Sequence, residues 1–312
     1  MMMSDSFAVM IIVATIASGI RLATPFLLAS LGEALGQRSG VLNLGVDGVM
    51  LLGAFGAYYT VLQSNNLYYG LLVGIAIGLL IGVFYAFITL NLQAEQGVSG
   101  IGIYLFGLGM SDLLFQKFVG TPRPILPFMP LDIPVLSGLP VVGEMLFQHS
   151  IIVYIAFGLV PVMSFVLYRT TYGLNIRAIG ENPEAADSLG VSVMATRYSA
   201  IIIGNGLAGL AGAALAIELG IFQQNLTNAM GFIAIALVYF GAWSPKGVMI
   251  GSLVFGLVQA IVLQCKTFGV IPRSASDLAA MAPAIITILA LVVVAKRFKQ
   301  PSALTKPYVR GG

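Results

Sequence analysis

Long apolar runs separated by short polar stretches cover most of this chain. A helix needs about 20 apolar residues to cross the hydrocarbon core of a bilayer, and most of the runs reach or approach that length. Charged residues make up only 9% of the sequence, against about 25% in a soluble domain. We therefore expect an all-α polytopic membrane protein, a single domain over residues 1–312 with about ten transmembrane helices. The runs lie at approximately 7–20, 22–36, 41–62, 68–90, 98–118, 149–168, 196–219, 230–242, 247–264 and 277–295.

Three of these runs are too short for a straight crossing: 7–20, 22–36 and 230–242. Short or broken helices are tolerated where the backbone faces protein or a water-filled path. Over residues 7–36 we expect two crossings, because Arg21 then lies in a turn at the interface. An arginine in the middle of the bilayer costs at least ~2.5 kcal/mol. A single tilted crossing there would instead place the N-terminus outside.

The basic residues indicate an orientation, because cytoplasmic loops of membrane proteins carry an excess of Lys and Arg. Ten crossings with both termini inside place ten basic residues in the cytoplasm and five outside. We therefore expect a plasma (inner) membrane protein with a cytoplasmic C-terminus and a cytoplasmic segment at about 169–195. The proline-rich loop at about 119–148 then lies outside, as a docking rim for an external partner or as a lid. The ten are Arg38, Arg169, Arg177, Arg197, Lys246, Lys296, Arg297, Lys299, Lys306 and Arg310.

The cytoplasmic segment contains the signals of a short, capped helix. Asn182 is a good N-cap, and Pro183 follows at the first helical position, where proline is favoured. Glu184 lies near the positive end of the helix dipole. Gly190 can end the helix in the left-handed conformation. The segment therefore predicts a surface helix over about 183–189, which is too short to be stable alone and is expected to contact another protein.

Polar residues inside the apolar runs are the candidates for a solute pathway. Asn43 and Asp47 are four residues apart, which places them on one face of a helix. They form either a polar wall of a pathway or a hydrogen-bonded pair that fixes the bundle. Asn205 and Gln259 suit a hydroxyl-rich solute, although single amides also join helices to one another.

One further pair is expected at the inner end of the second run. Glu33 and Arg38 have opposite charges and lie near the same end of the run, and we expect them to pair at the cytoplasmic side.

Several kinds of chemistry are excluded. The sequence has no G-x-x-x-x-G-K-[ST] phosphate-binding loop, so the chain cannot hydrolyse ATP on its own. No metal-ligand spacing is visible, and the one cysteine, Cys265, excludes an intrachain disulfide. The sequence Gly97-Val98-Ser99-Gly100 matches an intramembrane serine protease pattern, but the lone His149 lies near the outer interface, which disfavours that activity. We expect no enzyme activity, no bound cofactor or metal and, with a net charge of +3, no nucleic-acid partner.

Three blocks of sequence carry a resemblance to a known family. The block Leu31–Phe55, with the core Arg38-Ser39-Gly40-Val41-Leu42-Asn43-Leu44-Gly45-Val46-Asp47-Gly48, resembles the signature of ABC-transporter permeases of the simple-sugar and nucleoside branch. The block Gly173–Gly190 resembles the cytoplasmic coupling segment of that family. The block Gly231–Leu237, continuing to Pro245-Lys246-Gly247, is similar to its late signature. Gln37 and Asp47 each stand where the family usually has Glu.

The resemblance implies a type II ABC importer permease of the nucleoside-type smaller class. Its expected partners are ABC ATPase subunits that carry ATP–Mg, a second permease subunit of a different chain, an external substrate-binding lipoprotein and the lipid bilayer. The implied solute is a purine or pyrimidine nucleoside. The alternatives are a simple sugar such as ribose or galactose and, in another class, an ion-coupled secondary transporter that uses Asp47. The pathway candidates are Asn43, Asp47, Asn205 and Gln259, and the ATPase-coupling candidates are Arg177, Gly180, Glu181, Asn182, Pro183, Glu184, Ala185, Ala186 and Gly190.

Overall fold

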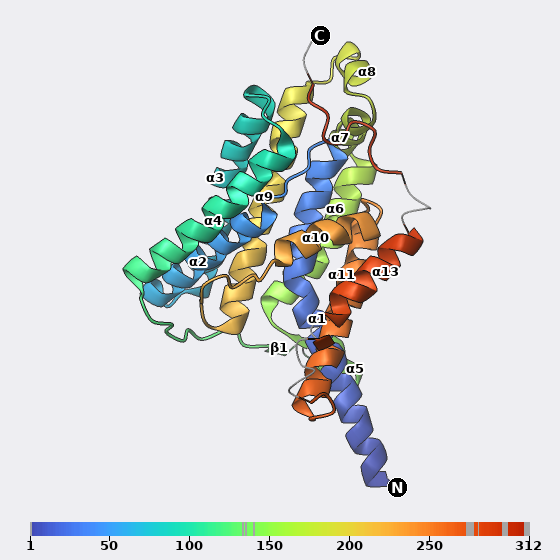
Figure 1. The fold of residues 1–312 in the computed structure, drawn as a ribbon. Helices are drawn as coiled ribbons and strands as arrows, with labels where there is room; N and C mark the ends of the chain where they lie inside the picture. The colour runs from blue at the N-terminus through green and yellow to red at the C-terminus, as the bar shows by residue number, and fades with distance from the viewer. Residues whose placement is uncertain are drawn as a thin grey trace.

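The computed structural model is a bundle of helices, most of which run between the two ends of the molecule (Figure 1). It describes residues 2–132, 134, 136–139, 141–272, 278–279, 281–294 and 299–308. The helices are α1 (Met2–Arg38), α2 (Val46–Ser64), α3 (Leu67–Ala86) with the π-helix η1 (Phe87–Asn91), α4 (Gln96–Phe118), α5 (Val142–Leu146), α6 (Ile151–Arg169), α7 (Thr171–Glu181), α8 (Pro183–Ser188), α9 (Val193–Leu219), α10 (Met230–Phe240), α11 (Pro245–Thr267) and α13 (Ala282–Val294).

Helix α1 is continuous, so the prediction of two crossings over residues 7–36 is wrong. Its 37 residues span roughly 55 Å, which exceeds the thickness of the hydrocarbon core. A helix of that length can cross once and still hold Arg21 outside the middle of the bilayer. Arg21 is exposed and lines the same cavity as Pro127 of the proline-rich loop, at one end of the bundle. No turn is therefore needed to bring this arginine to an interface.

The single helix also changes the expected placement of the two termini. The N-terminal end of α1 lies at the bottom of Figure 1, whereas the segment 299–308 lies at the top beside α7 and α8. The backbone N–H of Ala303 donates to the carbonyl of Gly180 at 2.8 Å, which fixes that placement. The prediction that both termini share one side is therefore wrong.

Helix α9 lies at the centre of the bundle and packs against α1, α2 and α3. Glycines at these contacts let the helix backbones approach closely, as in other membrane bundles. A Cβ added to Gly32 of α1 would lie 2.3 Å from the carbonyl oxygen of Gly204, and one added to Gly212 would lie 1.9 Å from that of Met50. These contacts leave no room for any side chain larger than hydrogen.

An all-α multi-pass membrane protein is confirmed, whereas the count of about ten spans stays a prediction. Six of the described helices are long and apolar enough to cross a bilayer: α1 from Met10, α3 with η1, α4, α6, α9 and α11. Helix α10, predicted to be short, has 11 residues and a length of about 16 Å, so it cannot cross the core alone. It lies crosswise between the longer helices (Figure 1).

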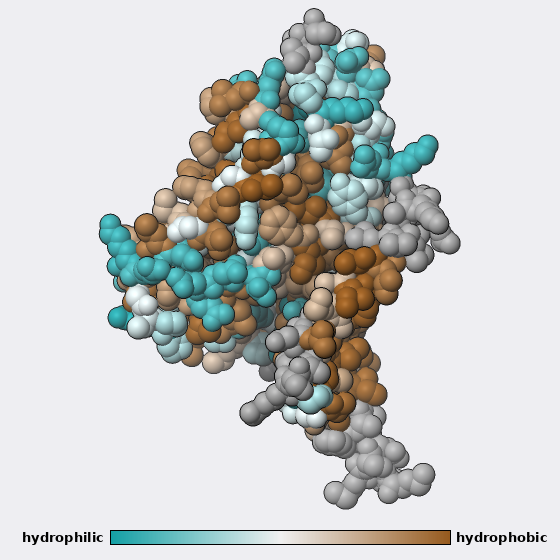
Figure 2. Space-filling model, viewed as in Figure 1, coloured by the Kyte–Doolittle hydropathy of each residue, from teal (hydrophilic) through white to brown (hydrophobic). Residues whose placement is uncertain are grey.

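The two ends of the bundle differ in structure. In Figure 2, hydrophilic surface gathers at the top, where α7 and α8 lie, and hydrophobic surface covers much of the helices below. At the opposite end the proline-rich loop contains α5 and a short antiparallel pair of strands, β1 (Leu131–Asp132) and β2 (Gln148–His149). This two-residue pairing is the one departure from an all-α fold within the described residues.

Candidate functional site

Helix α8 forms as its sequence predicts. The Asn182 side chain accepts a hydrogen bond from the backbone N–H of Ala185 at 3.0 Å, and Pro183 begins the helix. Gly190 has φ = +84°. The N–H of Val191 donates to the carbonyl of Ala186 at 3.1 Å, which closes a hydrogen-bonded loop of six residues. This is the Schellman termination that glycine favours. The helix ends at Ser188, one residue before the predicted end.

One face of α8 is buried and the other is open. Ala186 packs with Ile179 of α7 and Val193 of α9 in a small apolar cluster, with Tyr308 beside it. Glu184 and Ala185 are exposed. Leu189, just after the helix, is 85% exposed. A helix of six residues is therefore held by its base, while its outer face and a large apolar side chain remain available to another protein.

Helix α7 connects α8 to the end of α1. A Cβ at Gly180 would lie 2.0 Å from the carbonyl oxygen of Arg38, so only glycine allows this approach. The segment 299–308 binds the same helix, because Ser302 Oγ donates to Glu181 Oε2 at 2.9 Å, beside the Ala303–Gly180 bond. Movement of α7 and α8 is thereby linked to the C-terminal end of α1.

Arg177, another coupling candidate, does not extend from the exposed face of this unit. Its guanidinium lies 5.4 Å from the centre of the Tyr168 ring of α6, and its Nε donates to the carbonyl of Gly173 at 3.4 Å. Arg177 is half-buried and braces α7 against α6. Its position favours a role in holding α7 against α6 rather than at the exposed surface of α7 and α8.

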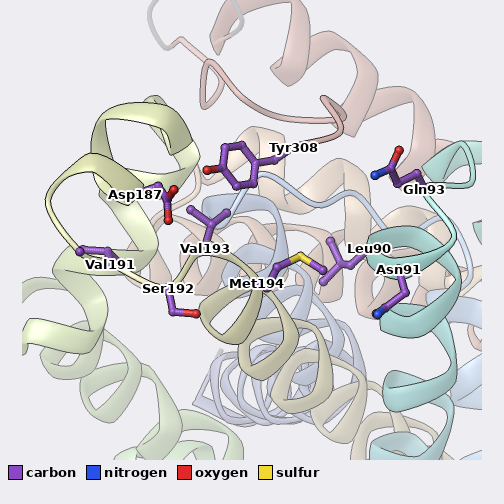
Figure 3. A pocket seen from close by; sticks show the side chains of 10 residues that line it. Leu90, Asn91, Gln93, Asp187, Val191, Ser192, Val193, Met194 and Tyr308 are labelled. Carbon is purple, nitrogen blue, oxygen red and sulfur yellow. The ribbon is translucent and has the colours of Figure 1, made fainter. Parts of the chain in front are cut away.

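A groove of about 520 Å³ runs beside α8 (Figure 3). Asp187, Val193 and Tyr308 lie at one end of the close-up, and Asn91, the last residue of η1, and Gln93, just after it, lie at the other. The walls are thus contributed by the α8–α9 connection, the α3–α4 connection and the C-terminal segment. Asp187 of α8 and Gly190, just after the helix, line the groove, so it lies directly beside α8.

A chain of hydrogen bonds runs beneath this surface, between α1 and the turn that follows α10. The indole Nε1 of Trp243 donates to Gln37 Oε1 at 2.7 Å, and Gln37 Nε2 donates to Glu33 Oε1 at 2.9 Å. Glu33 and Gln37 are buried. An amide at position 37 can accept from the indole and donate to the carboxylate at the same time, which a glutamate could not do without a shared proton.

The expected Glu33–Arg38 pair is not formed. Arg38 Nε donates instead to the backbone carbonyl of Trp243 at 3.0 Å. The same Glu33 oxygen that binds Gln37 also accepts the backbone N–H of Asn43 at 3.0 Å. Residues five apart on a helix point in different directions, which is why the carboxylate and the guanidinium find separate partners.

The prediction that Asn43 and Asp47 share a helix face is wrong, because α2 begins only at Val46. Asn43 lies in the non-helical connection and binds Asn205 of α9, its Nδ2 donating to Oδ1 at 2.9 Å. Its own Oδ1 accepts the N–H of Gly45 at 2.8 Å. Asn43 therefore fixes the break between α1 and α2 and joins it to the central helix.

Asp47 caps a different helix. Its Oδ1 accepts the backbone N–H of Gly231 at 2.7 Å, and its Oδ2 accepts the Thr227 hydroxyl at 2.9 Å. Gly231 is in the first turn of α10, where backbone N–H groups lack partners within the helix. Asp47 is fully buried. A carboxylate from α2 thus satisfies the buried, positive end of the short crosswise helix.

Two residues of this region were not identified as site candidates from the sequence. Arg197 of α9 is 1% exposed, and its Nε donates to the carbonyl of Ser39 at 3.0 Å while its Nη1 donates to that of Lys306 at 3.3 Å. Trp243 is the other. Both bind residues more than 100 positions away. An arginine one turn into an apolar helix is the sequence signal that could have identified Arg197.

Gln259, the remaining pathway candidate, lies apart from this network on α11. Its Oε1 is buried and has no hydrogen-bond partner among the described residues. The described residues also contain no group of three or more His, Cys, Asp or Glu side chains suited to a metal ion. The structure thus brings together Asn43 and Asn205, connects Asp47 to α10, and leaves Gln259 with a free acceptor.

The three sequence blocks therefore meet at one end of the molecule. Gly180 of the second block contacts Arg38 of the first, and Trp243 of the third binds Gln37 of the first. Residues 15–294 match the protein family described as branched-chain amino acid transport system / permease component.

Named relatives of the chain are also permeases. The chain is 40% identical over 253 residues to the putative glucose ABC transporter permease protein TsgC13 of Haloferax volcanii, covering 80% of this chain and 76% of the relative. It is 32% identical over 305 residues to the guanosine ABC transporter permease protein NupQ of Bacillus subtilis, covering 93% and 94%. It is 31% identical over 297 residues to the nucleoside ABC transporter permease protein NupC of Lactococcus lactis, covering 92% and 94%. No solved structure matches the chain. The match over most of the sequence shows that the chain belongs to the family of transport-system permease components.

Proposed function

We propose that this chain is the membrane-spanning permease subunit of an ATP-driven importer, with its coupling segment at about 169–195. The observation that carries the proposal is α8, a capped helix with a buried base and an open face. Its exposed Leu189 and Glu184 offer an apolar and an acidic contact to an ATPase subunit. The groove in Figure 3 extends that contact surface along the α3–α4 connection.

Transmission of movement follows from the contacts of α7. Closure of an ATPase pair on ATP would displace α8, and the close contact of Gly180 with Arg38 passes the displacement to the inner end of α1. The hydrogen bonds from Glu33 to Gln37 and Asn43 then reach the break before α2. Packed helices switch between discrete arrangements rather than deform continuously, so this junction is where inward and outward states would differ.

We infer that the solute is a nucleoside, with a simple sugar as the second candidate. The two relatives named for guanosine or nucleoside transport cover more than nine-tenths of both chains. The relative named for glucose is more similar but covers less of each chain. A purine or pyrimidine nucleoside and a sugar share a hydroxyl-rich ring, so both suit a path lined by uncharged donors and acceptors.

The partners follow from the same proposal. They are two ATPase subunits that bind ATP–Mg, a second permease chain, an external substrate-binding lipoprotein and the lipid bilayer. The proposed location is the plasma (inner) membrane, with α8 and the segment 299–308 in the cytoplasm. Basic residues support this orientation, because Arg38 contacts α7, Arg177 belongs to α7, and Lys306 lies in the segment that binds α7.

For the pathway candidates, we propose two different roles. Asn43, Asp47 and Asn205 are buried and hydrogen-bonded, and they hold the helix break and the end of α10 in place. Gln259 keeps the proposed role of a solute contact, because its acceptor oxygen has no partner among the described residues. The ion-coupled alternative needs an available carboxylate, and both oxygens of Asp47 are engaged as a cap.

Reconstitution tests the proposal. The permease complex is co-purified with its ATPase subunits and placed in liposomes. It should transport guanosine or another nucleoside only when ATP is supplied on the side of the membrane that carries the ATPase subunits and the binding protein is supplied on the opposite side. The variants Glu184→Ala and Leu189→Ser should assemble but hydrolyse ATP without uptake. Leu72→Ser, an exposed position on α3 outside the coupling segment, serves as the control. Uptake without nucleotide, or unchanged uptake in both variants, would refute the proposal.

A further inference from the structure

A second cavity lies at the end of the bundle opposite α8. It has a volume of about 450 Å³ and is bounded by α1, α9, α11 and the proline-rich loop. Gln148 and His149 of β2 line it, and β2 pairs with β1, which is labelled near the lower end of the bundle in Figure 1. Its size falls within the roughly 300–1,000 Å³ that is typical of small-molecule sites.

Polar side chains from three separate segments converge on this cavity. Arg21 comes from α1, His149 from strand β2, and Glu218 from the end of α9. Ser150 Oγ donates to Glu218 Oε1 at 2.6 Å. Arg21 makes one hydrogen bond to another described side chain, from Nη2 to Ser18 Oγ at 3.3 Å, and so keeps donors for a ligand.

His149 supplies an acceptor. Its Nε2 lies 2.9 Å from the backbone carbonyl of Met145, which can only accept, so Nε2 carries the proton. Its Nδ1 is then a bare lone pair, and it is buried without a partner among the described residues. Burial lowers the pKa of His149 below its usual value, which keeps the imidazole neutral at pH 7. The histidine is only 2% exposed.

Apolar groups complete the walls. Phe128 and Pro127 of the proline-rich loop line the cavity together with Leu22 of α1. The Phe128 ring is held by an edge contact with Tyr68, at 5.3 Å between ring centres. An aromatic ring beside a cation, a carboxylate and a neutral imidazole is suited to a neutral solute that has both a flat or apolar face and several hydroxyl groups.

We propose that this cavity binds the neutral, hydroxyl-rich solute of the importer, a nucleoside or a sugar, on the outer side of a single permease chain. The inference rests on the proposed function and adds a site to it. Arg21 donates to ring or base acceptors, Glu218 accepts from hydroxyl or amine groups, and Phe128 covers an apolar face. The proline-rich loop acts as the roof of the site.

Binding to the intact complex without nucleotide or binding protein tests this site. Guanosine, uridine, ribose and glucose are the probes, and saturation-transfer NMR or equilibrium dialysis measures their dissociation constants. Each of Arg21→Gln and Glu218→Gln should weaken binding by about ten-fold or more, since each removes a charged hydrogen-bonding group. Glu218→Gln keeps an acceptor for Ser150, so the fold is spared. Glu144→Gln and Arg123→Gln, exposed changes that do not line the cavity, should bind as the parent does.

The outcomes separate this inference from the proposed function. Unchanged binding in both Arg21→Gln and Glu218→Gln, with normal ATP-driven uptake, overturns the cavity site and leaves the importer intact. A phospholipid retained in the parent and lost in the two variants, with no probe bound, overturns it as well. A parent complex that shows no ATP-driven uptake of any probe refutes the proposed function, whatever the binding result.

Discussion

Asp47 gives a direct test of how the buried end of α10 is stabilised. Its two oxygens accept from the Gly231 N–H at 2.7 Å and from the Thr227 hydroxyl at 2.9 Å. Thr227 is fully buried, and Gly231 is buried against the backbone of Asp47. Replacement of Asp47 by Ala leaves two buried donors without acceptors. Each costs about 1–3 kcal/mol, so the variant should lose roughly 2–6 kcal/mol of stability.

Asp47→Asn is the more informative change. The amide oxygen can still accept from Gly231, and the Thr227 hydroxyl can rotate to accept from the new Nδ2. What is lost is the added strength of bonds to a charged acceptor, about 1–2 kcal/mol in total. Asp112→Asn on α4 is the control, because Asp112 Oδ1 has no hydrogen-bond partner among the described residues.

Thermal unfolding of the purified complex should rank the parent and Asp112→Asn first, Asp47→Asn next and Asp47→Ala last. In uptake assays, Asp47→Asn should retain ATP-driven transport, because the capping geometry survives. A variant Asp47→Asn that is as stable as the parent but transports nothing would refute the capping role. That result would favour the ion-coupled alternative, which requires the carboxylate itself.

Three further changes test separate contacts. Gly180→Ala forces the α7–α1 contact apart, since its Cβ would lie 2.0 Å from the Arg38 carbonyl oxygen. It should cost about 1–3 kcal/mol and reduce uptake per ATP hydrolysed. Gly158→Ala on α6, with no atom within 4 Å of the new Cβ, should lower neither stability nor uptake, because alanine is the better helix former. Trp243→Phe removes the donor to Gln37 and should cost about 1–3 kcal/mol in chemical unfolding; a loss no larger than that of an exposed substitution would contradict the network. The lowered pKa of His149 means that the folded state binds fewer protons than the unfolded state below about pH 6.5. The stability of the folded state should therefore fall as the pH drops from 7 to 5.5, and the fall should be smaller in His149→Gln.

The sequence predicts α8 well because its signals are local. Asn182, Pro183 and Gly190 each act on backbone groups within four residues of themselves. Contacts of that range can be read from a single segment. The same reasoning places the short apolar run that becomes α10 and the apolar faces of the longer helices.

The hydrogen bonds that join the end of α1 to the turn after α10 and to the start of α2 could not be predicted in the same way. Gln37 and Trp243 are 206 residues apart, and nothing near either position indicates the other. The run at 41–62 is apolar from its start and predicts a helix there. Glu33 and Asn205 instead bind Asn43 in the non-helical connection, and α2 begins only at Val46. Tertiary hydrogen bonds thus decided where the helix begins.

The continuous α1 has a related cause. The prediction of two crossings assumes that a helix is no longer than the membrane is thick, so that a single crossing would place Arg21 within the bilayer. A helix of 37 residues removes that restriction, because it can cross once and extend beyond the interface. Helix length, unlike capping, depends on what packs along the whole element.

Cross-linking at position 189 tests the central claim, that α8 docks on an ATPase subunit, most directly. In a Cys265→Ser background, Leu189→Cys places a single thiol on the side chain that is 85% exposed beside α8. The account predicts a zero-length or short cross-link from this thiol to the ATPase subunit in the intact complex. It also predicts that a membrane-impermeant reagent in sealed cells leaves the thiol unmodified. Labelling of position 189 from outside the cell, or a cross-link to the external binding protein instead, would contradict it.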